Sequence, residues 1–233
     1  MTDPALLLVA HGTRNPRGVE MIARLADSVS RRVGATRVAF VDVLGPSPAE
    51  ALRDATRPTV LVPAFLASGY HVHTDVPREV ADSGHDAVSI TPALGPDPVL
   101  ARVLLQRLTE TGWRPGDAVV LAAAGSSDPR ALRDVRHAAR MLSALVRSTV
   151  RVGYVATGEP RVPHVVASLR EQGARRVFIA SYLLAEGLFH TRLQDAGADG
   201  VSAPLGVTDS VVDLVARRYF TAARERVSSR SVR

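Results

Sequence analysis

The chain carries the same pattern of residues twice, and this repeat limits the folds open to it more than any other feature. "LLLVAHGTRNPRG" at 6–18 and "VVLAAAGSSDPRA" at 119–131 both run from aliphatic residues through a glycine to Pro-Arg and a helical pattern. "RVAFVDVLGPSP" then matches "RVGYVATGEPRV", and "TVLVPAFLASG" matches "RVFIASYLLAEG". A repeat of this length indicates two copies of one domain. We predict domains at 1–115 and 116–233, joined by the turn-rich segment "TGWRPGD".

Strand and helix patterns alternate within each copy. The expected strands of the first copy are continuous aliphatic runs at 5–10, 37–43, 58–66 and 87–91. Such runs are typical of strands buried on both faces. Apolar residues at helical spacing lie between them, and the first helix is expected to begin near Pro16. This alternation predicts an α/β fold of two tandem flavodoxin-like domains, each a parallel sheet flanked by helices.

Composition excludes several classes of protein. The 233 residues are 46% hydrophobic and 22% charged, which is typical of a globular protein. No apolar run reaches the roughly 20 residues that span a bilayer, and the first residues lack the basic segment of a signal peptide. We therefore expect a cytoplasmic protein with no membrane partner. Cysteine is absent, which excludes disulfides and thiolate metal sites.

The charge leaves two interpretations open. The net charge is +6, and the side chains that carry fixed positive charge are all arginine. Arginine binds carboxylates and phosphates with a planar fork, which favours an anionic partner. The codon usage of a GC-rich genome would also write arginine for lysine. Arginines are spread along the chain and aromatic residues make up only 4% of it, so stacking surfaces for bases are few and we expect no nucleic-acid partner.

Polar side chains follow three neighbouring strands of the first copy. His11 follows the first strand, Asp42 ends the second, and His71 and His73 follow the third. In such sheets ligands bind beyond the carboxyl ends of the strands, which lie about 4.8 Å apart. We expect His11, His71 and Asp42 to converge on one divalent metal ion, because imidazole suits iron, cobalt, nickel and zinc.

Two neighbours of this group are given other roles. If residues 71–75 are extended, His73 points to the same side as His71 and contacts the substrate or supports a ligand. Asp75 precedes a helical pattern, so we expect it to cap that helix.

The second copy lacks the polar group. Ala124 replaces His11, Ala156 replaces Asp42 and Phe189 replaces His71, with His190 beside it. A residue needed for folding would be present in both copies. We therefore interpret the first copy as the active half and the second as a degenerate wall or lid. Two histidines and one carboxylate leave coordination positions open, which suits a site that hands its ion over.

Three segments resemble the motifs of one family. "AHGTRNP", "FVDVLGPSP" and "PAFLASGYHVHTDVP" are similar, in this order, to motifs of the class II chelatases of the CbiX/SirB type, the sirohydrochlorin chelatases. The resemblance covers nearly the whole chain and includes the two-half organisation of the long members. It implies insertion of Fe²⁺ or Co²⁺ into sirohydrochlorin for siroheme or cobalamin biosynthesis, with Ni²⁺ as an in vitro alternative.

The resemblance also implies roles for individual residues. His11 and His71 match the histidines that bind the metal and accept pyrrole protons. Asp42 stands at the acidic position of the family, where the usual residue is Glu. Arg14 and Arg17 are candidates to bind the acidic side chains of the macrocycle. No organic cofactor is required, and because the halves already form a pseudo-dimer we expect a monomer.

Two other functions remain open. A metal or tetrapyrrole carrier would have the same site without turnover. A histidine phosphatase also opens on a strand ending in Arg-His-Gly, but here Ala10 replaces the arginine that would hold the phosphoryl group. The sequence leaves open which metal is used, which pathway is served, and what His73 and His190 do.

Overall fold

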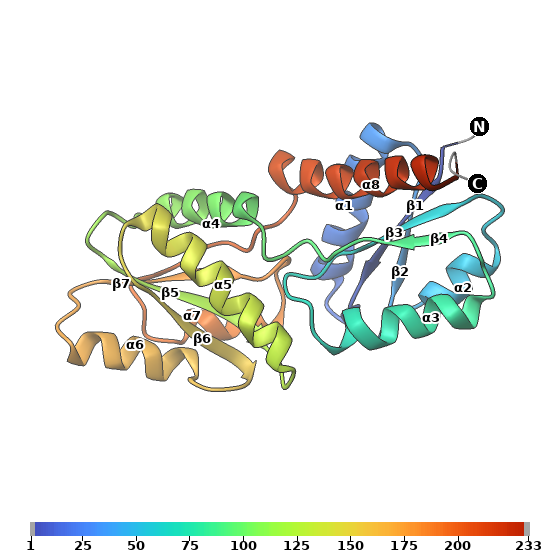
Figure 1. Cartoon of the computed structure of the whole chain (residues 1–233). Coiled ribbons are helices and arrows are strands. Elements are labelled where there is room, and N and C mark those ends of the chain that lie inside the picture. The colour runs from blue at the N-terminus through green and yellow to red at the C-terminus, as the bar shows by residue number, and fades with distance from the viewer. Residues whose placement is uncertain (1–2, 231–233) are drawn as a thin grey trace. The chain divides into compact units, whose positions relative to one another are not determined.

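The computed structural model describes residues 3–230, which form two compact units (Figure 1). Unit 1 comprises the described residues of 1–94 and 209–233, and unit 2 comprises residues 95–208. Each unit contains one four-stranded sheet in which all neighbouring strands are parallel. The prediction of two α/β domains with parallel sheets is therefore confirmed.

Unit 1 has the strand order β2-β1-β3-β4, so the first three strands are neighbours, as expected. The strands are β1 (Ala5–Ala10), β2 (Thr36–Phe40), β3 (Thr59–Pro63) and β4 (Val88–Ile90). The helices are α1 (Pro16–Val33), α2 (Pro48–Arg53), the single π-helical turn η1 (His71–Asp75), α3 (Val76–Ser83) and α8 (Asp209–Arg230).

Unit 2 repeats this topology with the order β6-β5-β7-β8. Its strands are β5 (Ala118–Gly125), β6 (Val150–Thr157), β7 (Val177–Tyr182) and β8 (Gly200–Val201). Its helices are α4 (Pro98–Glu110), α5 (Pro129–Val146), α6 (Val162–Glu171) and α7 (Leu188–Gln194).

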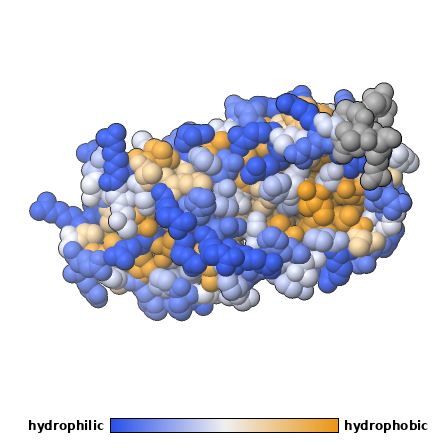
Figure 2. Space-filling model, viewed as in Figure 1, coloured by the Kyte–Doolittle hydropathy of each residue, from blue (hydrophilic) through white to orange (hydrophobic). Residues whose placement is uncertain are grey.

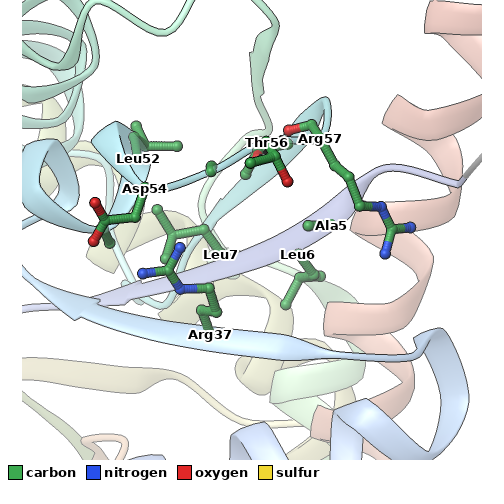
Figure 3. Close-up of a pocket in the computed structure, with 11 residues that line it drawn as sticks. Ala5, Leu6, Leu7, Arg37, Leu52, Asp54, Thr56 and Arg57 are labelled. Atoms are coloured by element: carbon green, nitrogen blue, oxygen red, sulfur yellow. Dashed lines mark hydrogen bonds between the residues drawn. The ribbon is translucent and has the colours of Figure 1, made fainter.

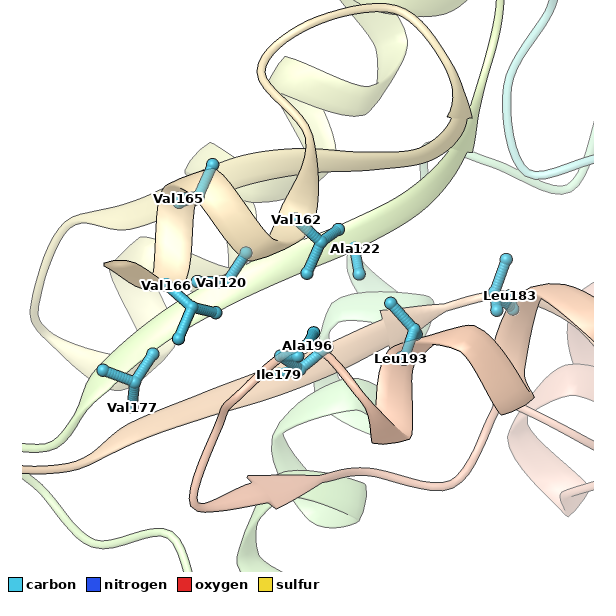
Figure 4. Close-up of a cluster of buried hydrophobic side chains, with 10 residues drawn as sticks. All are labelled: Val120, Ala122, Val162, Val165, Val166, Val177, Ile179, Leu183, Leu193 and Ala196. Carbon is cyan, nitrogen blue, oxygen red and sulfur yellow. The ribbon is translucent and has the colours of Figure 1, made fainter. Parts of the chain in front are cut away.

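Each sheet is buried on both faces, which explains the continuous aliphatic runs. In unit 1, Leu7 and Val9 of β1 pack in a cluster with Leu52 and Val76 beneath α2 and α3. Helices α1 and α8 pack against each other and against the sheet. In unit 2, Figure 4 shows the matching cluster, in which β5 and β7 meet side chains of α6 and α7. Each buried aliphatic side chain contributes about 1.5–3 kcal/mol to folding.

The first helix of each unit begins in the same way. The side chain of Asn15 accepts a hydrogen bond from the Arg17 backbone N–H at 3.0 Å, and Asp128 accepts one from that of Arg130 at 2.8 Å. A proline at the first helical position follows each cap, as its fixed φ favours. The caps set the length of the loop between each central strand and its helix, and His11 lies in the loop of unit 1.

The compact units differ from the predicted domains 1–115 and 116–233 at their last helices. Helix α4 packs on β7 and α5 in unit 2, whereas α8 packs on α1, β3 and β4 in unit 1. In Figure 1 the red α8 accordingly lies beside the blue α1. The "TGWRPGD" segment is therefore a turn inside unit 2, where Trp113 is buried, rather than a linker. Because the two closing segments have similar apolar patterns, the sequence alone does not show which sheet each covers.

The helices of the described residues do not have the length and hydropathy of membrane spans. Among residues 3–230, none is long and apolar enough to cross a bilayer. Hydrophilic residues cover much of the face shown in Figure 2, and the hydrophobic residues there lie in separate patches.

Helix α4 comes from the first repeat and packs in unit 2, whereas α8 comes from the second and packs in unit 1. This exchange of the last helices predicts which unit is destabilised by a substitution in the core. Leu214 of α8 and Leu104 of α4 are both buried, so replacing either with alanine should cost about 2–5 kcal/mol. Leu214→Ala should reduce amide-exchange protection in residues 3–94, and the matched Leu104→Ala should reduce it in β5 and β7, measured by hydrogen exchange with mass spectrometry. Loss of protection in β5 and β7 from Leu214→Ala would contradict the exchange.

Candidate functional site

Two imidazole rings meet at the carboxyl edge of the sheet in unit 1. β1 and β3 are neighbours paired at Val9 and Pro63, so the segments that follow them leave the sheet side by side. The ring centroids of His11 and His71 are 4.6 Å apart, with an interplanar angle of 83°. His11 is exposed, and 35% of the His71 side chain is exposed. The expected convergence of these two side chains is therefore observed, and a ligand can reach both.

The glycine after His11 allows the close approach that positions it. Gly12 has φ +95°, and a Cβ there would lie 2.0 Å from the backbone oxygen of Asp42. The Asp42 N–H in turn donates a hydrogen bond to the His11 carbonyl at 3.0 Å. Only glycine fits such a contact in this conformation. The backbone of residues 11–12 therefore lies directly against the turn that follows β2.

A buried carboxylate fixes the orientation of His71. Asp75 Oδ2 lies 2.7 Å from His71 Nδ1, and Asp75 Oδ1 lies 3.0 Å from Arg78 Nη2. Only 10% of the Asp75 side chain is exposed, whereas Arg78 reaches solvent. The Phe65 ring stacks on His71 with centroids 6.1 Å apart. A carboxylate acceptor at Nδ1 favours the tautomer that leaves the Nε2 lone pair available to a ligand.

The predicted helix-capping role of Asp75 is wrong. Its backbone is helical, at φ −69° and ψ −48°, and its side chain makes no capping hydrogen bond. The π-helical turn η1 runs directly into α3, so Asp75 lies inside a continuous helical segment and faces the residue four positions earlier. The spacing His-x-x-x-Asp was the signal that could have revealed this pair.

The same helical turn removes the basis for the role of His73. That role assumed an extended segment in which alternate side chains share one side. Residues 71–75 are helical instead, so His73 points away from the direction of His71. The structure places His73 at the exposed surface and does not bring it to the imidazole pair.

Asp42 lies near the two imidazoles but does not form a metal-binding group of three side chains with them. β2 ends at Phe40, so Asp42 lies in the turn beyond the strand and is exposed. Its Oδ1 accepts a hydrogen bond from the Val43 backbone N–H at 2.8 Å. Within residues 3–230, no group of three His, Asp, Glu or Cys side chains is arranged to hold a metal ion. The structure thus brings together two of the three expected ligands.

The two arginines expected to bind the substrate lie beside His11. Arg14 is in the loop after β1 and Arg17 is in the first turn of α1, and both are exposed. A groove in unit 1 lies elsewhere. Figure 3 shows it at the amino end of β1, lined by Ala5, Leu7 and Arg37 among others, whereas His11 follows the carboxyl end of the same strand.

Unit 2 has lost the chemistry at the equivalent positions. The pairing of Val9 with Pro63 corresponds to that of Ala122 with Ser181. The bond from the His73 N–H to the Gly69 carbonyl likewise corresponds to that from Thr191 to Gly187. The equivalences that follow are Ala124 for His11, Phe189 for His71 and Leu193 for Asp75. Leu193 is a buried member of the core, so the orienting carboxylate is lost together with the imidazole.

One equivalence differs from the sequence alignment. Gly125, at φ +97°, approaches the backbone oxygen of Thr157, where a Cβ would lie 1.7 Å away. A β-bulge between Ala123 and Gly125 shifts the register by one residue. Thr157 rather than Ala156 therefore occupies the position of Asp42, and it also carries no carboxylate.

Two polar side chains near this edge of unit 2, those of His190 and Tyr182, are held within the fold. His190 Nε2 lies 3.0 Å from the carbonyl oxygen of Ser202, to which it donates a hydrogen bond. Burial raises the pKa of Tyr182, and the nearby Asp134 and Asp97 raise it further, so this phenol stays protonated at neutral pH. The imidazole pair of unit 1 therefore has no counterpart at the equivalent positions of unit 2.

These features define a duplicated α/β protein in which one copy carries a histidine-pair site. The family model of CbiX matches the chain twice, at residues 5–111 and 118–222, and the chain belongs to the CbiX family. The two matches follow the repeat seen in the sequence.

Curated proteins are similar to this chain. A sirohydrochlorin ferrochelatase of Priestia megaterium is 24% identical over 205 residues, which cover 82% of this chain and 77% of the relative. A sirohydrochlorin cobaltochelatase of Saccharolobus islandicus is 28% identical over 120 residues, which cover 46% of this chain and 94% of the relative. The second match indicates that about half of this chain corresponds to the whole of some relatives.

A solved structure has the same fold. SirB from Bacillus subtilis with Fe³⁺ superposes with a TM-score of 0.82 and 22% identity, covering 97% of this chain and 98% of that one. The fold is therefore shared along almost the whole length of both chains.

The close contact at Gly12 predicts that alanine there destabilises the protein more than alanine at a glycine without such a contact. Gly84 is left-handed, with φ +69° and ψ 10°, but a Cβ there meets nothing within 4 Å. Gly84→Ala should cost about 1 kcal/mol for conformation alone. Gly12→Ala should cost about 2–4 kcal/mol, because it adds a clash with the Asp42 backbone to a conformational cost of this kind. Urea unfolding of both variants measures the difference, and equal losses would contradict the contact.

Proposed function

We propose that this protein is a sirohydrochlorin chelatase, a lyase that inserts Fe²⁺ or Co²⁺ into sirohydrochlorin in siroheme or cobalamin biosynthesis. The observation that carries the proposal is the pair of imidazole rings with centroids 4.6 Å apart, present in one copy of a repeated scaffold and absent from the other. Membership of the CbiX family and the activities named for its curated relatives support it.

The imidazole pair suits an ion that must be transferred. Neutral imidazole binds divalent iron and cobalt, and two such ligands leave most coordination positions open. The macrocycle nitrogens can then enter the open positions while the protein ligands leave. A closed cage of four protein side chains would hold the ion instead.

The same residues can accept protons. Metal insertion releases two protons from the pyrrole nitrogens of the macrocycle. Imidazole, whose ordinary pKa is about 6.5, can accept a proton near neutral pH. Asp75 binds Nδ1 of His71, so the second nitrogen of that ring is directed toward the reaction. We assign both roles, metal ligand and proton acceptor, to His11 and His71.

Further contacts complete the proposed site. Asp42 is the candidate third ligand, since rotation of its side chain would exchange the Val43 N–H for the metal ion. Arg14 and Arg17 would bind the carboxylates of the macrocycle, which need cationic partners. His73 is left out, because it points away from the pair. The reaction needs no organic cofactor, and we expect a cytoplasmic monomer that also accepts Ni²⁺ in vitro.

Removal of either imidazole should abolish metallation. His11→Ala and His71→Ala should each lower the rate by about 100-fold or more, because each loses a metal ligand and a proton acceptor. Both substitutions are at accessible positions, so the fold should be retained in circular dichroism. The measurement is the change in the absorption spectrum of sirohydrochlorin on addition of Fe²⁺ or Co²⁺ under anaerobic conditions.

A histidine of unit 2 provides the control. His190→Gln keeps a donor for the Ser202 carbonyl and should leave the rate within about twofold of the wild type. A large loss in this variant would place the site in unit 2. A wild-type protein that binds cobalt and sirohydrochlorin without accelerating the reaction would be a carrier.

Loss of the orienting carboxylate should weaken metal binding without unfolding the protein. Asp75→Leu places in unit 1 the residue that unit 2 has at this position, Leu193, and should lower cobalt affinity about 10–100-fold. Asp75→Asn keeps an acceptor for Nδ1 and should lose less. Cobalt titration by visible absorption measures both variants, and an unchanged affinity in Asp75→Leu would contradict the orienting role.

A further inference from the structure

Val43 adopts a backbone conformation that valine disfavours. Its φ is +69°, in the left-handed region, where a β-branched side chain crowds the neighbouring backbone. The Leu44 N–H donates to the Asp42 carbonyl at 2.8 Å, which closes a three-residue turn with Val43 at its centre. A γ-turn with positive φ is rare and strained. Val43 is 46% exposed, so little burial offsets this strain.

Unit 2 shows which residue the scaffold uses where folding alone decides. Val43 directly follows Asp42, the residue against Gly12. In unit 2, Gly158 directly follows Thr157, the residue against Gly125, and it has φ +103°. Glycine adopts a positive φ at little cost. The turns that follow differ in length, since Pro46 comes three residues after Val43 and Pro160 two residues after Gly158. In both units, however, a residue with positive φ directly follows the one that lies against the glycine, and only unit 2 has glycine there.

One other residue can be compared with Val43 for its backbone conformation. Among residues 3–230, the only other non-glycine residue with positive φ is Arg147, at φ +56°. It follows the last turn of α5, where a left-handed residue is a common way to end a helix. Arg147 thus has an ordinary structural reason for its conformation, and Val43 does not.

The valine lies at the edge of the imidazole pair. The Asp42 N–H bonds to the His11 carbonyl at 3.0 Å, which ties the turn around Val43 to the first histidine. Next to the second histidine, Tyr70 is 53% exposed, and its ring centroid is 6.0 Å from that of His71. Two exposed apolar residues thus lie close to the imidazoles: Tyr70 by its ring contact with His71, and Val43 because it directly follows the residue bonded to the His11 backbone.

We propose that Val43 and Tyr70 form an apolar contact surface for one face of the tetrapyrrole macrocycle, and that Val43 keeps its strained conformation for this contact. The inference rests on the proposed function, since it takes the conjugated ring as the flat apolar ligand. A disc held on these side chains would present its central nitrogens to the ion on His11 and His71, and such positioning lowers the barrier to transfer. Strain that persists in a folded protein is concentrated at functional sites.

Binding measurements separate this role from a structural one. Val43→Gly removes both the strain and the side chain, so its Tm should be unchanged or raised by a few degrees. Its Kd for sirohydrochlorin, measured by absorption without metal, should rise about 3–10-fold. Its Kd for cobalt should stay within about twofold of the wild-type value. Val43→Asn tolerates the same backbone and should show the same weakened binding.

Controls make each outcome decisive. Arg147→Gly relieves a left-handed residue of unit 2, at the end of α5, and should leave both Kd values unchanged. Tyr70→Ala should raise the Kd for sirohydrochlorin as Val43→Gly does. An unchanged sirohydrochlorin Kd in Val43→Gly, or an equal loss of cobalt affinity, would overturn the inference. Failure of the proposed function is distinct, because the wild type would then bind the macrocycle without accelerating its metallation.

Discussion

The parallel pairing of β1 with β2 and β3 is the constraint on which the site depends. β1 lies at the centre of the sheet in unit 1, and its two neighbours end at the same edge. The three segments that leave this edge carry His11, Asp42 and His71. The contact of Gly12 with the Asp42 backbone then holds the first two segments together. The two imidazoles are sixty residues apart in the sequence, and the parallel pairing of β1 with β3 brings them together in space.

The second copy separates what the fold needs from what the chemistry needs. Both copies keep the glycine that lies against the neighbouring turn and the proline that begins the first helix. The imidazoles and the orienting carboxylate occur only in unit 1, where unit 2 has Ala124, Phe189 and Leu193. At the residue with positive φ, in contrast, unit 2 has the glycine that suits this backbone conformation, and unit 1 has Val43. A single chain therefore contains its own comparison for each of these positions.

Much of this arrangement could be predicted from the sequence, and the misses have physical causes. The repeat, the strand order and the meeting of His11 with His71 follow from hydrophobic runs and from the rule that parallel strands share a carboxyl edge. The capping role expected for Asp75 is wrong, and the extended geometry assumed at His73 is absent, because residues 71–75 form a π-helical turn. Local spacing alone does not distinguish such a turn from an extended loop. The exchange of α4 and α8 was missed because their apolar patterns are alike. The strain at Val43 is a property of φ, which no residue pattern displayed.

The central claim is that one metal ion binds both imidazoles of unit 1. Cobalt K-edge X-ray absorption of the protein loaded with one equivalent of Co²⁺ tests it directly, since imidazole rings give a characteristic scattering pattern from their outer atoms. We expect two imidazole ligands in the wild type, with the remaining positions filled by oxygen. A spectrum with one imidazole or none would contradict this account.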